Sequence, residues 1–259
     1  MKESFGNEPF QLFDGSVSAV HLGRDYGDFG RGVEDREKKI LYACERSLNW
    51  FGVALPKIAF SNDVFLVPEI LTDRFVRSIV YSQRESDAVI LKRLDFVLAI
   101  ANADCHLGVF YHKDTKQLAL VHLGLKCIVR EDDSPTIIET VFRAMKVPPE
   151  EVQVWVGAGI GSCCNGYSFE YDFARKVAKK FPNCVGGEVI KGPRTGQVAF
   201  DNIGICEKIL RSCGVRDLVL APRCTACAED ERRNKLFHSN VYDTDKTLAR
   251  NLFMVRLVS

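Results

Sequence analysis

The sequence predicts a mixed α/β fold, in which a β-sheet core is flanked by helices within one layered domain. Two observations predict this class. Helix-like and strand-like patterns alternate along the 259 residues, and one β-hairpin interrupts the alternation. No repeat, low-complexity tract or long linker divides the chain, so we expect a single domain over residues 1–259. An apolar fraction of 46% against 27% charged residues excludes a disordered chain.

Four segments have the apolar spacing of amphipathic helices. In Val33–Phe51 the apolar residues recur at helical spacing with charges between them. Ser134–Met145 begins with Ser-Pro, a capping residue followed by proline at a tolerated first helical position. The other two predicted helices are Phe169–Phe181 and Asp201–Cys213, and Gly214 stops the last one.

Shorter apolar segments predict the strands. Phe96–Ala101 is a continuous apolar run that ends at Asn-Ala-Asp, which is typical of a buried strand. Gly108–Tyr111 and Leu118–Val121 flank the polar stretch HKDTKQ and predict a hairpin. Three further strands are predicted at Val152–Val156, Leu218–Ala221 and Phe253–Val258.

The hairpin brings one cysteine and one histidine together. If its loop is centred on Asp114–Thr115, Leu107 is paired with His122 on the neighbouring strand. Cys105 is two residues from Leu107 and therefore on the same face, within reach of His122 or of a shared ligand. His106 is expected to point to the opposite face.

The Cys105–His122 pair fits three interpretations. The two side chains could be ligands of a zinc ion that keeps an open position for water. Alternatively, His122 could activate the Cys105 thiolate as a nucleophile. The third interpretation is structural: a buried cysteine beside a hydrogen-bonded histidine on neighbouring strands.

A glycine-rich loop and two cysteine pairs are the other motifs. GAGIGSCC places Gly159 and Gly161 just after a strand, where their N–H groups could bind a phosphate, although a tight turn explains them equally well. Cys163-Cys164 and Cys224-x-x-Cys227 could together hold a zinc ion. A vicinal pair is poor geometry for that site, and we therefore expect these cysteines to pack as small apolar residues.

Charge and hydropathy restrict the partners. The net charge of +1 gives no basic excess, so we expect no nucleic acid polymer as a partner. The N-terminal segment lacks the pattern of a signal peptide, and no apolar run is long enough for a bilayer. We therefore expect a cytoplasmic protein without a membrane partner, whose ten cysteines are mostly reduced. The sequence does not predict an oligomeric state.

The order of the motifs ADC, H-x-G, G-x-G-x-G-x-CC and CTxC resembles the bacterial laccase-domain family, whose members are labelled polyphenol oxidases. The resemblance covers most of the chain and implies a layered α/β domain with a His, Cys and His zinc site. It matches Cys105 to the cysteine ligand and His122 to the later histidine. Leu71 occupies the position of the earlier histidine, and no histidine occurs between His21 and His106.

The resemblance also implies other site residues. Lys126 stands where the family has an arginine, and Arg36 retains a charged position, so either could contact an anion such as phosphate. His21 replaces an asparagine that the family places near its site. It could bind substrate or supply the missing ligand, or it could be a surface or capping residue at a strand end.

Three functions follow from these motifs. The resemblance implies an enzyme of purine nucleosides, catalysing phosphorolysis or adenosine deamination at a Cys105–His122 site, with nucleoside and phosphate as partners. A metal-free cysteine hydrolase or deamidase is the second, because the fold resembles that of necrotizing-factor deamidase toxins. A non-catalytic descendant is the third. Several coppers are excluded, because five histidines without a His-x-His pair cannot ligate them.

Overall fold

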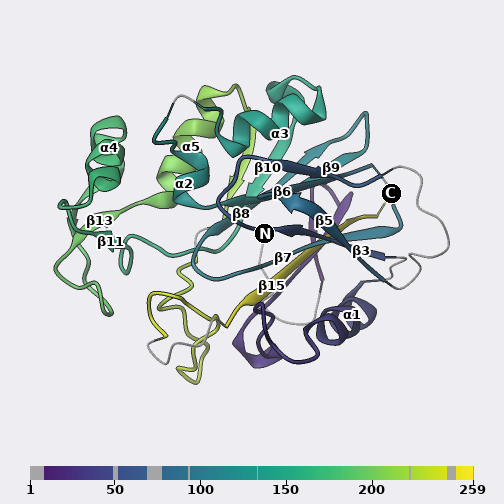
Figure 1. Ribbon diagram of the computed structural model, residues 1–259, viewed down its shortest axis with the longest axis horizontal. Coiled ribbons are helices and arrows are strands. Elements are labelled where there is room, and N and C mark those ends of the chain that lie inside the picture. The colour runs from purple at the N-terminus through teal and green to yellow at the C-terminus, as the bar shows by residue number, and fades with distance from the viewer. Residues whose placement is uncertain are drawn as a thin grey trace.

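Two six-stranded mixed sheets form the centre of the computed structural model (Figure 1). The structure describes residues 9–48, 52–68, 78–92, 94–132, 134–221, 223–243 and 249–258. In order across the first sheet, the strands are β1 (Phe10–Leu12), β2 (Val17–Leu22), β15 (Asn251–Leu257), β7 (Phe96–Asn102), β3 (Gly52–Lys57) and β5 (Ile79–Glu85). Across the second sheet they are β14 (Asp217–Leu220), β10 (Gln153–Val156), β8 (His106–His112), β9 (Gln117–Leu123), β6 (Ala88–Leu91) and β4 (Val64–Leu66).

The remaining elements cover the two sheets or extend from them. The helices are α1 (Arg36–Ser47), α2 (Leu125–Ile128), α3 (Ile137–Met145), α4 (Asp172–Lys180) and α5 (Asn202–Ser212). A small sheet has the order β11 (Gly166–Tyr167), β13 (Val198–Phe200) and β12 (Val185–Glu188). Short 3-10 helices span Arg24–Tyr26, Pro149–Glu151 and Pro182–Cys184. None of the helices among the described residues has the length and apolarity needed to cross a membrane.

The layers are held together by three apolar clusters. One lies between the two sheets, where the rings of Trp155 in β10 and Phe253 in β15 stack with centroids 5.4 Å apart. A second joins the other face of the second sheet to helices α2 to α5. The third joins the first sheet to α1, on the opposite side of the molecule (Figure 1). The predicted α/β class is confirmed, with two packed sheets in the core in place of the one expected.

The predicted register of the hairpin is confirmed. β8 and β9 pair antiparallel, and Leu107 is opposite His122. The alternation of side chains in this hairpin fixes which residues face the space between the sheets and which face the helices. A shift by one residue would exchange the two sets.

One helix starts later than the sequence predicted. Helix α3 begins at Ile137, and its N-cap is Thr136 in place of Ser134. The side chain of Thr136 accepts a hydrogen bond from the N–H of Glu139, whose carboxylate accepts one from the N–H of Thr136 at 2.7 Å. This reciprocal capping box satisfies two N–H groups that the helix itself cannot satisfy, whereas Ser134 bonds to side chains outside the helix.

Helix α5 shows the ends that its sequence predicted. The carboxylate of Asp201 accepts a hydrogen bond from the N–H of Gly204 at 3.1 Å and caps the first turn. Gly214 follows the last turn with a φ of +102°, a conformation that glycine adopts without strain. The predicted helices Val33–Phe51 and Phe169–Phe181 are shorter in the structure, as α1 and α4, and residues 49–51 lie outside the described residues.

Candidate functional site

A cavity of about 630 Å³ receives side chains from both sheets and from the loops at their ends. This size suits a small organic ligand. Cys105, His122, Arg36 and Lys126, four of the residues singled out from the sequence, line it. Sequence reasoning missed other lining residues, among them Phe60, Asn102, Asp104, Tyr167, Arg194, Asn202 and Arg250.

The imidazole of His122 is oriented by a buried carboxylate. Asp87 immediately precedes β6, and the pairing of Ala88 with Val121 brings Asp87 beside His122. The Nδ1 atom of His122 lies 2.6 Å from Oδ1 of Asp87. The other carboxylate oxygen of Asp87 accepts hydrogen bonds from the N–H of Ser61 at 2.6 Å and from its hydroxyl at 3.0 Å. These contacts fix the orientation of the His122 ring and do not involve its Nε2 atom.

Electrostatics favour opposite charges on this pair. Burial by itself would lower the pKa of His122, but its interactions with Cys105 and with the Asp87 carboxylate raise that pKa well above its usual value. Burial would raise the pKa of Asp87, yet its hydrogen bonds to His122 and Ser61 lower it. The imidazolium and the carboxylate therefore stabilise each other away from solvent.

Cys105 reaches the cavity from a tight turn between β7 and β8. Asp104 has a φ of +71°, and the N–H of Cys105 donates to the carbonyl of Ala103 at 3.0 Å. The amide of Asn102 donates to the Cys105 carbonyl at 2.6 Å. The thiol and the His122 ring therefore share one cavity, as the hairpin register predicted.

Asp104 ties this turn to two distant segments. Its Oδ1 atom accepts a hydrogen bond from the hydroxyl of Thr225 at 3.0 Å, and its Oδ2 accepts one from the N–H of Val241 at 2.9 Å. The carbonyl of Asp104 accepts a further bond from the N–H of Ile160 at 2.6 Å. The position of Cys105 thus depends on loops that follow β10 and β14.

One group around His122 could hold a metal. Ligand atoms of Asp87, His122 and Cys127 all lie within 4.8 Å of one another. Cys127 belongs to α2, and its Sγ atom is 3.9 Å from Nδ1 of His122. The sequence predicted Cys105 and His122 as the ligands and missed Asp87, because its contact depends on the β6–β9 pairing. Leu71, at the position of the absent family histidine, lies outside the described residues.

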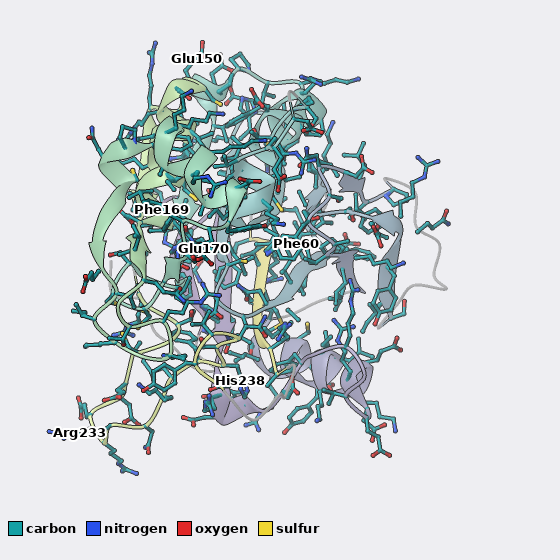
Figure 2. All side chains as sticks on the ribbon, turned by 60° about the vertical axis from the view of Figure 1, so that its left-hand side comes forward. Phe60, Glu150, Phe169, Glu170, Arg233 and His238 are labelled. Carbon is teal, nitrogen blue, oxygen red and sulfur yellow. The ribbon has the colours of Figure 1, made fainter. Side chains whose placement is uncertain are left out.

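The wall around His122 also contains a half-exposed aromatic ring. The ring centroids of Phe60 and His122 are 5.4 Å apart in an edge-on arrangement, and Phe60 is labelled in Figure 2. A Cβ atom on Gly124 would lie 3.0 Å from carbon atoms of both rings. Glycine at this position therefore permits the close contact between chain and rings.

Several cationic side chains border the cavity, among them Arg36, Lys126 and Arg194. Arg36 is the first residue of α1, and its Nε donates to the carbonyl of Phe29 at 2.8 Å. Lys126, in α2, places its Nζ 5.6 Å from the centre of the Tyr171 ring. Arg194 donates to the carbonyl of Gly166 at 2.9 Å. They come from three separate parts of the chain and face one space, which favours an anionic ligand there.

His21 and His106 lie away from this cavity. His21 is not among the residues that line it; it is a buried residue of β2 whose ring contacts Phe237 and Phe253. It is therefore not a surface residue, and burial lowers its pKa to about 3. His106 points to the opposite face of the hairpin, as predicted, with Nδ1 2.8 Å from the carbonyl oxygen of Gly157.

The glycine loop does not offer its N–H groups to a phosphate. The N–H of Gly159 donates to the carbonyl of Arg223 at 3.0 Å, and that of Gly161 donates to Sγ of Cys224 at 3.3 Å. Neither glycine lines the cavity. The two glycines instead form a tight structural turn, which is the alternative that the sequence left open. A Cβ on Gly159 would lie 2.5 Å from the His106 ring, so only glycine fits at this position.

Solved structures of bacterial proteins share this fold. Protein NMB0706 of Neisseria meningitidis is 18% identical over 94% of this chain and 95% of its own, with a TM-score of 0.70. The hypothetical protein YfiH of Bacillus licheniformis is 16% identical over 93% of both chains, with a TM-score of 0.68. YlmD of Geobacillus stearothermophilus is 17% identical over 94% of this chain and 92% of its own, with a TM-score of 0.63.

Sequence comparison assigns the family. No curated protein matches the chain at a significant level. A family model described as multi-copper polyphenol oxidoreductase laccase matches residues 14–247, which is most of the sequence. The matched range includes Cys105 and His122, which both line the cavity. The chain therefore belongs to the multi-copper polyphenol oxidoreductase laccase family.

Proposed function

We propose that this protein acts on purine nucleosides in the cavity, and that phosphorolysis is its principal reaction. The observation that carries the proposal is the meeting of Cys105 and the Asp87-oriented His122 in a cavity bordered by cationic side chains. The volume of the cavity also supports the proposal, since about 630 Å³ suffices for a nucleoside together with phosphate.

The cations support phosphate as the second substrate. Arg36, Lys126 and Arg194 would neutralise the anion and hold it beside the ribose. In phosphorolysis a phosphate oxygen forms a bond to C1′ of the ribose while the bond from C1′ to the base nitrogen breaks. The departing base takes the electron pair and then a proton, so the reaction needs an anion site and a proton donor.

Aromatic and amide side chains support recognition of the base. Phe60 and Tyr167 offer ring faces on which a purine could stack. Asn102 and Asn202 line the same cavity, and their side-chain oxygens have no hydrogen-bond partner among the described residues. Because these oxygens are buried, either amide would have to rotate toward the cavity before its oxygen could accept a hydrogen bond from an amino group of the base.

Two residues of the cavity carry donors that zinc takes, one fewer than the three protein ligands of a catalytic zinc site. A thiolate and an imidazole are ligands that zinc prefers, and a carboxylate on the far ring nitrogen is the usual partner of a zinc-bound histidine. Cys105 and His122, with Asp87 behind the ring, supply these groups. Zinc bound there would act as a Lewis acid and lower the pKa of a coordinated water molecule. Asp87, meanwhile, would hold the ring orientation and the position of its proton at Nδ1.

The copper chemistry in the family description does not fit these residues. Copper centres of oxidases need several imidazole ligands. Two groups among the described residues could hold a metal, and His122 is the one histidine in them. His238, for example, lies far from Phe60 in Figure 2 and bonds to the carbonyl of Gly27 at 3.2 Å.

The assay for this function uses the purified protein with adenosine, inosine and guanosine, with and without phosphate. Phosphorolysis predicts free base and ribose 1-phosphate that appear only with phosphate, whereas deamination predicts inosine from adenosine in either condition. Cys105→Ala and His122→Gln should abolish product formation. Cys213→Ala, which changes a half-buried cysteine outside the cavity, should not. The absence of product from all three nucleosides would overturn the proposal.

A cysteine hydrolase or deamidase is a second candidate. It is favoured by the spatial arrangement of three side chains. The Cys105 thiol interacts with the His122 imidazole, which in turn bonds to the buried Asp87 carboxylate, as in enzymes with an activated nucleophile. Selective labelling of Cys105 by iodoacetamide at neutral pH, with no loss of labelling after treatment with a chelator, would support it. Labelling of Cys105 no faster than of Cys213 would exclude it.

A further inference from the structure

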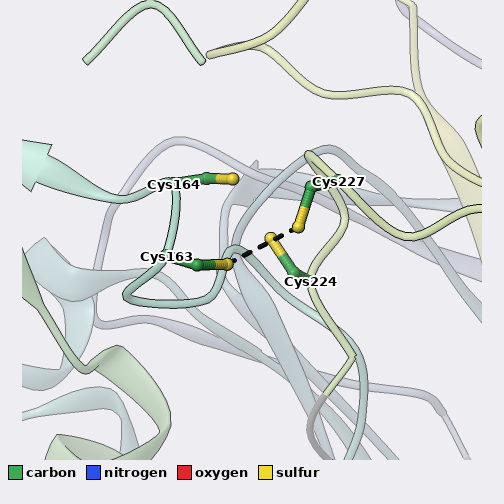
Figure 3. A group of neighbouring side chains, drawn as sticks. All are labelled: Cys163, Cys164, Cys224 and Cys227. Atoms are coloured by element: carbon green, nitrogen blue, oxygen red, sulfur yellow. Dashed lines mark hydrogen bonds between the residues drawn. The ribbon is translucent and has the colours of Figure 1, made fainter. Parts of the chain in front are cut away.

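Two loops that follow neighbouring strands bring four cysteines together. β10 and β14 pair in parallel, so the segments after them leave the second sheet at the same edge. The backbones then pair again, since Gly159 bridges to Cys224 and the N–H of Thr225 donates to the carbonyl of Gly159 at 3.1 Å. Cys163 and Cys164 belong to the first segment, and Cys224 and Cys227 to the second (Figure 3).

The four sulfur atoms have the spacing of a tetrahedral metal site. All four Sγ atoms lie within 4.8 Å of one another, and those of Cys163 and Cys227 are 3.5 Å apart. Thiolates at a Zn–S distance of about 2.3 Å occupy the corners of a tetrahedron with edges of about 3.8 Å. The separation of 3.5 Å between Cys163 and Cys227 is close to this value, and Figure 3 shows the four side chains converging on one another.

The vicinal pair does not prevent this arrangement, although its geometry was expected to be poor. The N–H groups of Cys164 and Asn165 both donate to the carbonyl of Gly161 at 2.9 Å. This tight turn directs both sulfur atoms toward the second loop. The four cysteines thus form a cluster with a common centre, where the sequence favoured independent packing.

One backbone N–H group and small or apolar residues enclose the cluster. The N–H of Gly161 donates to Sγ of Cys224 at 3.3 Å, and such bonds orient and stabilise metal-bound sulfur. A Cβ on Gly161 would lie 3.4 Å from Sγ of Cys163, so glycine keeps the backbone close to the cluster. Ile160 and Ala226 are buried against it and exclude water from that side.

We propose that Cys163, Cys164, Cys224 and Cys227 bind one zinc ion as four thiolates. Binding transfers the four thiol protons to solvent and forms four Zn–S bonds, with no change of oxidation state. Four protein ligands leave no open position, so the ion has a structural role. This site is separate from the cavity and does not depend on the function proposed for it.

The zinc would fix loops that reach the cavity. Thr225 lies between the two cysteines of the second loop and donates to Asp104, the neighbour of Cys105. Ile160 lines the cavity and donates its N–H to the carbonyl of Asp104. The ion would therefore hold the turn that carries the Cys105 thiol, although it lies outside the cavity itself.

The test measures zinc in a Cys105→Ala protein purified without added metal, which removes the cavity thiol as a ligand. One zinc per chain is expected, and X-ray absorption should give four sulfur neighbours at about 2.3 Å. Adding Cys224→Ser and Cys227→Ser should remove the zinc, whereas adding Cys213→Ser should leave one per chain.

Three results would overturn the proposal. These are a Cys105→Ala protein without zinc, a zinc content that the two serine substitutions do not change, and nitrogen or oxygen neighbours in place of sulfur. Bound iron with sulfide, or a disulfide within the cluster in freshly purified protein, would also count against it. X-ray absorption is measured on the Cys105→Ala protein, in which all four cysteines of the cluster are present. The proposal therefore stays testable if the serine variants fail to fold.

Discussion

Nδ1 of His122 and Oδ1 of Asp87 are 2.6 Å apart, and both side chains are buried. The bond joins the end of β9 to the residue before β6, and it orients the imidazole that lines the cavity. Each member would be unstable in this environment without the other, since an isolated buried charge is costly.

Replacing Asp87 by Asn should therefore impair the site. Asn keeps the volume but loses the charge and can present an N–H to the ring, so His122 would lose its orientation and its preferred proton position. We expect a fall in kcat/KM of about 10- to 100-fold in the nucleoside assay. Asp63→Asn, which changes an exposed carboxylate nearby, is the control. Equal kcat/KM for Asp87→Asn and wild type would contradict this role.

Lys126 should act on phosphate more than on the nucleoside. Lys126→Ala removes a charge-assisted hydrogen bond to phosphate at this half-exposed position. It should raise the KM for phosphate roughly tenfold, with little change in the KM for inosine. Lys126→Arg should restore most of the affinity, and Lys179→Ala, an exposed lysine of α4, should have no effect. A rise in the inosine KM alone would show that Lys126 contacts the nucleoside.

Buried His21 should make the protein sensitive to acid. Its pKa is lowered to about 3 in the folded chain, against about 6.5 in an unfolded one. Below pH 6.5 the unfolded state binds a proton that the folded state does not, so stability falls as the pH falls.

At pH 5 this difference amounts to about 2 kcal/mol. Urea unfolding of wild type and His21→Asn between pH 5 and 8 measures it. Between pH 8 and pH 5 the free energy of unfolding should fall by about 2 kcal/mol less in His21→Asn than in wild type. This difference does not depend on how stable the variant is at pH 8. Parallel pH profiles for the two proteins would refute the assignment.

The start of α3 gives a prediction about stability alone. Thr136→Ala removes the hydroxyl of the capping box and should lower the free energy of unfolding by about 0.5–2 kcal/mol. This corresponds to a fall in Tm of about 2–4 °C per kcal/mol for a chain of this size. Ser134→Ala should change stability by less than about 0.5 kcal/mol. The reverse order of the two effects would favour the cap expected from the sequence.

The sequence predicted contacts that are set by local patterns. The hairpin around Asp114–Thr115 has a loop and two apolar runs next to each other in the chain, and these determine the pairing of Leu107 with His122. The meeting of Cys105 and His122 followed from that register. Asp201 and Gly214 likewise mark the ends of α5 by chemistry contained in a few residues.

Contacts between distant segments could not be predicted in this way. Asp87 reaches His122 because β6 pairs with β9, and nothing near Asp87 in the sequence specifies that pairing. Similarly, the cysteine pairs meet because β10 and β14 are parallel neighbours. The glycine loop was ambiguous for the same reason, since the acceptors of its N–H groups, Arg223 and Cys224, are contributed by the other loop.

The position of β15 has a consequence for how the chain folds during synthesis. This strand lies between β2 and β7 and pairs with both, although it is made last among the strands of either large sheet. The second sheet draws its strands from residues 64–220 and can assemble while the ribosome is still translating. Until residues 251–257 emerge, the apolar edges of β2 and β7 remain open to other chains. We therefore expect ribosome-stalled chains lacking β15 to aggregate more readily than the full chain.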